Sequence, residues 1–125
     1  MKAKGNFIQQ RLKSFKYAFK GFKLLLLKEG NFQVQFLVAI IAIVLGFVFD
    51  ISSTEWMIQL GAIGLVLVAE GLNTSIEKLA DFVHKENHPK IGVVKDISAG
   101  ACLIASCIGL AIGLILYLPK IAMIL

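Results

Sequence analysis

The chain has 125 residues, of which 58% are hydrophobic and 17% are charged, and its formal net charge is +5. This length allows one domain at most, and so apolar a composition excludes an ordinary water-soluble domain. Eight of the thirteen Lys and Arg residues precede residue 30. Because long apolar runs follow, this basic segment indicates attraction to anionic lipid and not binding to nucleic acid.

Residues 6–29 are predicted to form an amphipathic helix that lies in the headgroup plane of a membrane. Apolar side chains recur at helical spacing along one side, and lysines occupy the other. The apolar side consists of Phe7, Phe15, Phe19, Phe22 and Leu26, and the basic side of Lys13, Lys16, Lys20 and Lys23.

Three runs without any charged residue follow, at 34–49, 56–69 and 97–119. Each approaches the roughly 20 residues that cross a bilayer, and a backbone in lipid must satisfy its own hydrogen bonds. We therefore predict transmembrane helices at 32–50, 55–84 (with a cytoplasmic extension) and 93–118, with Pro89 and Gly92 as breakers in the last loop. The expected fold is an all-α membrane protein with one domain over 1–125. Cys102 and Cys107 are interpreted as packing residues.

The distribution of cations predicts the orientation of these helices. Lysines are abundant before the first span and between the second and third, whereas the 50–55 turn has none and the C-terminus has only Lys120. The N-terminus, which has no cleavage pattern behind its first apolar run and is expected to be retained, is predicted to be cytoplasmic. The 50–55 turn and the C-terminus are predicted to face outward.

The second predicted span carries polar side chains on one face. At about 100° per residue, five of six polar residues fall within about 80° of arc and the sixth, Asn73, flanks them. The other five are Glu70, Thr74, Glu77, Asp81 and His84. An ionisable group in the hydrocarbon costs about 2.5 kcal/mol or more, so Glu70 is interpreted as functional. Asp81 and His84 are interpreted as ordinary polar residues of a helix end.

Other acidic residues gather at the same membrane face, namely Glu29, Glu86 and Asp96. Two or more carboxylates, together with water and phosphate oxygens, make a Mg²⁺ site. The sequence contains neither a P-loop nor a GxGxxG motif. Any nucleotide chemistry must therefore use helix ends and short loops.

Three segments carry a resemblance to a known family: FKYAFKGFK…KEGNFQ (15–33), EGLNTSIEKLADF (70–82) and HPKIGVVKDISAGA (88–101). They resemble the prokaryotic diacylglycerol kinase and undecaprenol kinase family. The resemblance implies a homotrimer of three-span subunits in the bacterial inner (plasma) membrane. It also implies transfer of the γ-phosphoryl group of MgATP to the hydroxyl of a membrane lipid.

The resemblance also implies residue roles. Glu70 would be the general base, Glu29 and Glu77 would bind Mg²⁺, and Asn73 would orient the base or the substrate hydroxyl. Glu70, Asn73 and Ser98 would contact the lipid substrate. The residues expected at ATP are Gln10, Tyr17, Glu29, Glu77, Glu86, Asn87, His88, Lys95 and Asp96.

Gln10 and Gln35 depart from the diacylglycerol-type pattern, which has Arg and an acid there. The lipid is therefore open between undecaprenol, slightly favoured, and diacylglycerol. A small proton- or cation-coupled transporter or pore subunit is the alternative, since it would also place carboxylates in a membrane. A structural or regulatory subunit is a third interpretation. The acids stop at one leaflet, which favours the kinase.

Overall fold

The computed structural model describes residues 5–125 and consists of four helices, with no strand among those residues. In chain order they are α1 (Phe7–Lys28), α2 (Gly30–Val48), α3 (Ser53–Val83) and α4 (Pro89–Ile124). Three of them, α2, α3 and α4, are long and apolar enough to cross a membrane. The predicted all-α membrane fold is confirmed. Lys2 and Lys4, which belong to the basic N-terminal segment, lie outside the described residues.

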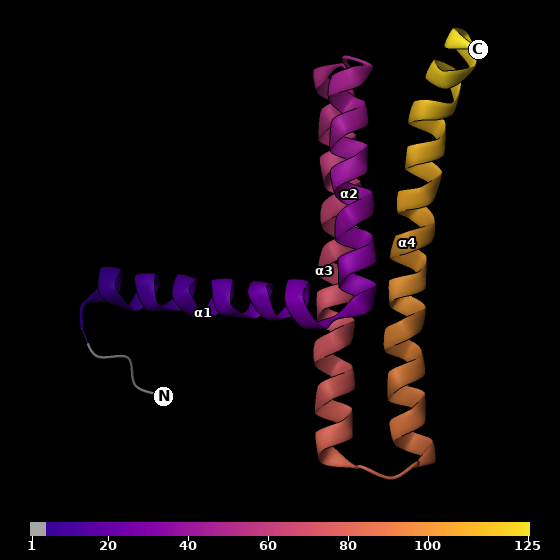
Figure 1. The fold of residues 1–125 in the computed structure, drawn as a ribbon. Helices are drawn as coiled ribbons and strands as arrows, with labels where there is room; N and C mark the ends of the chain where they lie inside the picture. The colour runs from indigo at the N-terminus through magenta and orange to yellow at the C-terminus, as the bar shows by residue number, and fades with distance from the viewer. Residues whose placement is uncertain (1–4) are drawn as a thin grey trace.

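Helix α1 lies at a steep angle to the other three helices (Figure 1). It begins at a capping box, in which the Asn6 side chain accepts from the Gln9 backbone and the Gln9 side chain accepts from the Asn6 backbone. None of its residues is buried, and Phe7 and Phe19 are 72% and 70% exposed. An amphipathic helix with an uncovered apolar face fits a location on the membrane surface.

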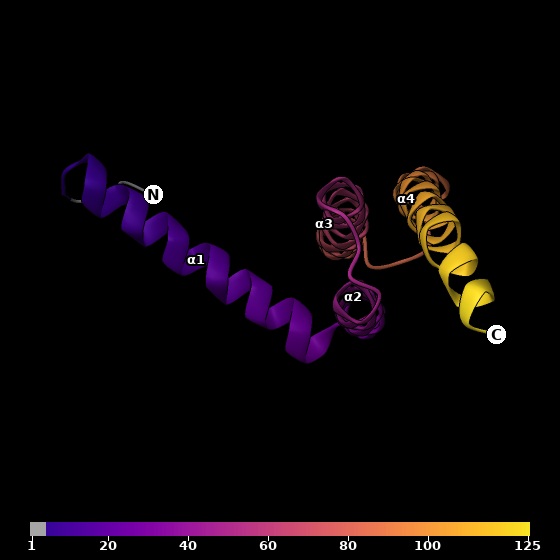
Figure 2. The same cartoon turned by 90° about the horizontal axis from the view of Figure 1, so that it is seen from above.

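Helices α2, α3 and α4 run side by side, and seen from above they form a triangle (Figure 2). Helix α3 packs against both of the others, and most of its contacts are with α4. The 31 residues of α3 extend over about 46 Å, which exceeds the roughly 30 Å of a hydrocarbon core. One end of α3 therefore projects beyond the membrane.

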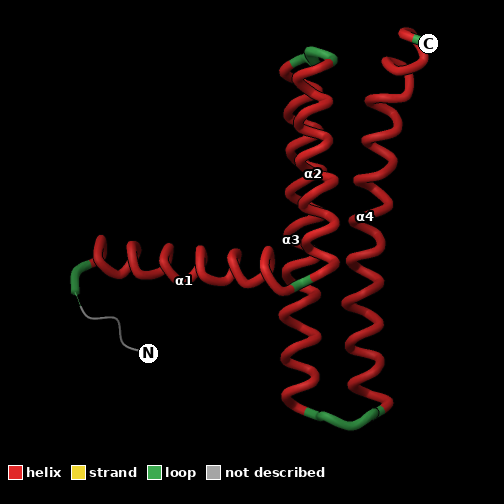
Figure 3. Tube along the Cα trace, viewed as in Figure 1, coloured by secondary structure: helices red, strands yellow, loops and turns green. Residues whose placement is uncertain are grey.

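The connections between helices are short (Figure 3). Asp50 adopts a left-handed conformation with φ of 48° in the turn after α2, which Asp tolerates better than most residues. Ser52 then caps α3, because its side chain accepts from the Glu55 backbone. At the end of the bundle beside this turn, Ile51, Leu116 and Tyr117 form a buried cluster, against which Trp56 packs.

The last helix differs from the predicted 93–118. It begins at Pro89, because a proline at the first helical position lacks only an N–H that would have no partner there. Gly92 is consequently helical and does not break the chain. The helix also continues through Pro119 to Ile124. Prolines are tolerated inside membrane helices where neighbouring groups compensate the lost backbone bond.

Candidate active site

The junction of α1 and α2 meets α3 beside Glu70. The Leu25 Cδ1 atom lies 3.4 Å from where a Cβ of Gly71 would stand. Because α1 has the character of a surface helix, this contact marks the level of the membrane interface on α3. Glu70 lies at that level, and the 13 residues from Gly71 to Val83 extend about 19 Å beyond it.

The polar stripe of α3 changes from buried to exposed along the helix. Glu70 and Asn73 are each 8% exposed, whereas Glu77 and Asp81 are exposed. The buried end is covered by α4, whose Ser98 and Cys102 are themselves buried. The predicted clustering on one face therefore yields two environments: a buried end where α1 meets α3 and an exposed end in the last turns of α3.

A chain of hydrogen bonds joins α4 to this stripe through Asn73. The Ser98 hydroxyl donates to Asn73 Oδ1 at 2.6 Å, and Asn73 Nδ2 donates to Glu77 Oε1 at 3.2 Å. A carboxylate only accepts hydrogen bonds, so the bond to Glu77 requires the NH₂ end of the amide, and the Ser98 hydroxyl, which can donate or accept, donates to the amide oxygen. Asn73 thereby holds the Glu77 carboxylate.

Glu70 has no ion-pair partner among residues 5–125. The Cys102 thiol lies beside its carboxylate. The buried Glu70 carboxylate therefore faces a thiol, and no cation pairs with it within the described residues. Sequence reasoning had treated Cys102 as a packing residue only; its position one helical turn after Ser98 was the signal that both face α3.

The two predicted magnesium ligands have different partners. Glu29, between α1 and α2, forms an ion pair with Lys78 at 3.1 Å, while Glu77 accepts from Asn73. No group of three potential metal ligands exists in the described part of the chain. The two carboxylates nevertheless supply hard oxygen donors, and Glu77 is exposed, so water and phosphate oxygens can complete the coordination that Mg²⁺ prefers. The donor set fits. Lys78 was not predicted.

A cavity of about 400 Å³ lies at the end of α3 and α4 where the two helices are connected. Its lining includes four residues expected at ATP: Glu86, Asn87, His88 and Lys95. Lys95 forms an ion pair with Asp81, and the His84 and His88 rings lie 5.1 Å apart. Asp81 and His84, interpreted from sequence as ordinary helix-end residues, thus belong to the same cavity.

Other predicted ATP residues are not brought to this cavity. Asp96 is exposed and does not line it. Gln10 and Tyr17 lie on α1, about 27 Å and 17 Å along the helix axis from its end at Lys28. Their role at ATP stays a prediction.

A family profile described as prokaryotic diacylglycerol kinase matches residues 16–117. The chain belongs to the prokaryotic diacylglycerol kinase family. It is therefore a lipid kinase. The match covers α2 and α3 completely, together with α4 up to Tyr117. It therefore includes the buried residues of the site, Glu70, Asn73, Ser98 and Cys102.

Individual members of the prokaryotic diacylglycerol kinase family align over most of this chain. The undecaprenol kinase of Bacillus subtilis (strain 168) is 35% identical over 116 residues, which are 93% of this chain and 94% of that protein. The diacylglycerol kinase of Escherichia coli (strain K12) is 28% identical over 94 residues, or 75% and 77% of the two chains. That of Helicobacter pylori (strain ATCC 700392 / 26695) is 33% identical over 103 residues, or 82% and 79%.

Proposed function

We propose that this lipid kinase transfers the terminal phosphoryl group of ATP to the hydroxyl of undecaprenol, with Glu70 as general base. The observation that carries the proposal is the position of Glu70, a buried carboxylate without a cation at the level where α1 meets α3. A lipid alcohol presents its hydroxyl at this level while its tail remains in the bilayer. Nucleotide arrives from the opposite, cytoplasmic end of α3.

The reaction needs one proton acceptor and one electrophile. Glu70 takes the hydroxyl proton as the lipid oxygen attacks the γ-phosphorus, the bond from that phosphorus to the β–γ bridging oxygen breaks, and ADP leaves. Phosphoryl transfer depends mainly on positioning and charge neutralisation, so few groups are required. Asn73, oriented by Ser98, holds Glu77 at the exposed side of Glu70.

Glu29 and Glu77 would hold Mg²⁺, which supplies neutralisation of phosphate charge when bound. The cavity lined by Glu86, Asn87, His88 and Lys95 is the proposed place of the nucleotide. Asp81 in that cavity lies about 16 Å along α3 from Glu70. A nucleotide bound there therefore has to direct its phosphates along α3 past Glu77.

Undecaprenol is preferred over diacylglycerol on the basis of similarity. The undecaprenol kinase of Bacillus subtilis aligns over 93% of this chain at 35% identity, whereas the diacylglycerol kinases of Escherichia coli and Helicobacter pylori align over 75% at 28% and over 82% at 33%. Membership of the kinase family also argues against the alternative of a transporter or pore subunit. The homotrimer implied by the resemblance stays a prediction.

The proposal is tested by assaying the purified protein with γ-labelled ATP and Mg²⁺. Undecaprenol, diacylglycerol and no added lipid are compared at matched concentrations. We expect label in undecaprenyl phosphate, at a rate well above that for diacylglycerol, and none without lipid. Label in phosphatidate alone would contradict the assigned lipid, and label in neither would contradict the proposed reaction.

A further inference from the structure

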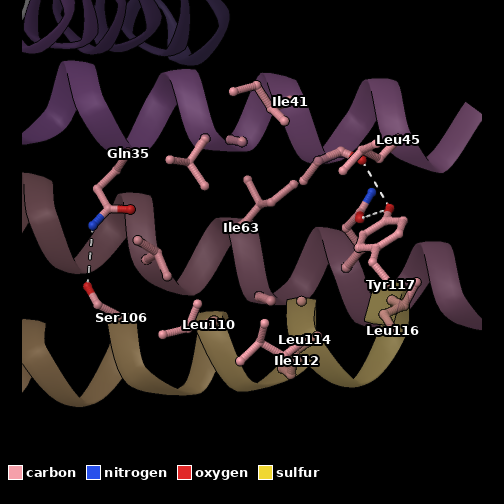
Figure 4. Close-up of a pocket in the computed structure, with 18 of the residues that line it drawn as sticks. Gln35, Ile41, Leu45, Ile63, Ser106, Leu110, Ile112, Leu114, Leu116 and Tyr117 are labelled. Atoms are coloured by element: carbon pink, nitrogen blue, oxygen red, sulfur yellow. Dashed lines mark hydrogen bonds between the residues drawn. The ribbon is translucent and has the colours of Figure 1, made fainter. Parts of the chain in front are cut away.

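An apolar groove of about 520 Å³ runs between α2, α3 and α4, apart from the cluster at Glu70 (Figure 4). It lies over α3, in the space between α2 and α4. Small residues on all three helices give it depth: Ala39, Ala42, Ala62, Gly109 and Gly113. Between its ends the walls carry only apolar side chains.

Each end of the groove carries polar contacts that join helices. At the end nearer Glu70, Gln35 Nε2 of α2 donates to Ser106 Oγ of α4 at 3.5 Å. At the other end, the Tyr117 hydroxyl reaches the Ala42 carbonyl at 3.0 Å and also contacts the Gln59 side chain (Figure 4). The contact between Gln35 and Ser106 is at the long limit for a hydrogen bond, so breaking it costs little free energy.

One end of the groove lies at nearly the same position along α3 and α4 as Glu70. Leu67, which lines it, precedes Glu70 by about 4.5 Å along α3, and Ser106 follows Cys102 by about 6 Å along α4. Gly113 lies about 16 Å from the level of Cys102, and Tyr117 about 22 Å. The groove therefore starts beside the proposed base and passes the midplane of a hydrocarbon core about 30 Å thick.

We propose that this groove is the binding site for the isoprenoid chain of the acceptor alcohol, an inference that rests on the proposed function. An alcohol whose hydroxyl is at Glu70 has to continue into apolar surroundings, and the groove leaves from that point. The groove is one cavity of about 520 Å³, which suits the one chain of a polyprenol. The two chains of a diacylglycerol would leave one of them outside it.

Gly113 provides a way to block the groove without disturbing the fold. A Cβ added there meets no heavy atom within 4 Å, so Gly113→Leu adds its side chain in open space at a residue that lines the groove. Ala111→Leu is the matched control, because Ala111 is exposed two residues away on α4 and does not line the groove. The two variants add apolar bulk at nearly the same membrane depth.

The test measures kcat/KM for prenols of two, three, four and eleven isoprene units with MgATP. Each unit extends about 5 Å, from C–C bonds of about 1.5 Å, so a chain reaches Gly113 at three to four units. For the wild type we expect kcat/KM to rise from two to four units. Gly113→Leu is expected to lose at least tenfold on four and eleven units and little on two, while Ala111→Leu follows the wild type.

Two results would overturn the groove assignment: a wild-type kcat/KM that does not depend on chain length, or a Gly113→Leu variant with the wild-type length profile. A second copy of this chain is the competing occupant. If a second copy fills the groove, Gly113→Leu changes the mass of the assembly in light scattering and lowers kcat/KM equally for all prenols. That result would also overturn the assignment. A wild type inactive on every prenol contradicts the proposed function instead.

Discussion

Asn73 is the residue that connects the buried and exposed halves of the site. Both ends of its amide are engaged, one by the Ser98 hydroxyl and the other by Glu77. An amide held at both ends cannot rotate to present the other atom. Ser98, implied by the family resemblance to contact the lipid, therefore acts in this structure through Asn73, and we interpret it as a positioning residue.

We predict that Ser98→Ala lowers kcat by roughly tenfold, which corresponds to about 1.4 kcal/mol. The change leaves the buried Asn73 Oδ1 without a donor, and the amide is then held only by its bond to Glu77. Steady-state kinetics in an Asn73→Ala background checks this: there the same substitution is expected to have little further effect. Ser75→Ala, at an exposed position of α3, is the control. Fully additive losses would mean that Ser98 acts independently of Asn73.

The ion pair between Glu29 and Lys78 contributes little to stability. The Lys78 side chain is 71% exposed, and exposed pairs contribute about 0–1 kcal/mol. Glu29 can therefore exchange this partner for another cation at small cost. That property suits a proposed metal ligand.

At the scale of elements, Gly46 determines how closely α2 approaches α3. A Cβ at this buried position would lie 2.7 Å from Trp56 Cη2 and 3.2 Å from Gln59 Nε2. The Phe47 ring packs against the same indole at an interplanar angle of 55°, with ring centroids 5.0 Å apart. The indole also packs against the cluster of Ile51, Leu116 and Tyr117, so a side chain at Gly46 would have to displace it from that packing.

We predict that Gly46→Ala destabilises the protein by about 1–3 kcal/mol, the usual cost of overpacking. Gly61→Ala on α3 is the control, because a Cβ there meets nothing within 4 Å. Unfolding of both variants in mixed detergent micelles, followed by circular dichroism, measures the difference. Equal midpoints for the two variants would show that α2 and α3 are not packed in this way.

Helix identity was predictable because apolar runs and 3.6-residue periodicity are local properties of the sequence. The end of α3 was predicted within one residue, since polar residues and His84 follow it directly. The start and end of α4 were not, because a proline stops a helix in one context and begins or interrupts it harmlessly in another. That context is set by neighbouring helices and by lipid.

At the scale of the whole molecule, polar and basic groups separate along the axis of the bundle. The α3–α4 connection lies at one end, and the turn after α2 and the C-terminus lie at the other (Figure 1). Lys85 and Lys90 belong to the first end, whereas the Lys120 ammonium at the second is paired with Glu55 at 2.7 Å. This arrangement supports the proposed orientation, with the C-terminus outside the cell.

Cysteine labelling checks that orientation. In a background with Cys102 and Cys107 replaced by Ala, we predict that a membrane-impermeant maleimide labels Leu125→Cys in intact cells. Lys85→Cys is expected to react with the maleimide only after the membrane is permeabilised. Labelling of Lys85→Cys alone in intact cells would show that the orientation is reversed.

Part of the site could be predicted from the sequence and part could not. Glu70, Asn73 and Glu77 share one helix, so their clustering follows from helical geometry alone. The Ser98 and Cys102 contacts depend on how α4 packs on α3, and the Lys78 partner of Glu29 depends on the junction of three helices. Gln10 and Tyr17 remain far from the cavity within one chain, so their predicted role requires contacts that a single chain does not contain.

The most direct test of the whole account is the rate of lipid phosphorylation by Glu70→Gln. This change preserves shape but removes the proton acceptor, and general bases contribute typically 10²–10⁴-fold. We expect a loss of about that size, with unchanged helix content by circular dichroism. Glu55→Gln, in the first turn of α3 and far from Glu70, is expected to retain wild-type activity. A Glu70→Gln enzyme within a few-fold of the wild type would contradict the assignment of Glu70 as the base.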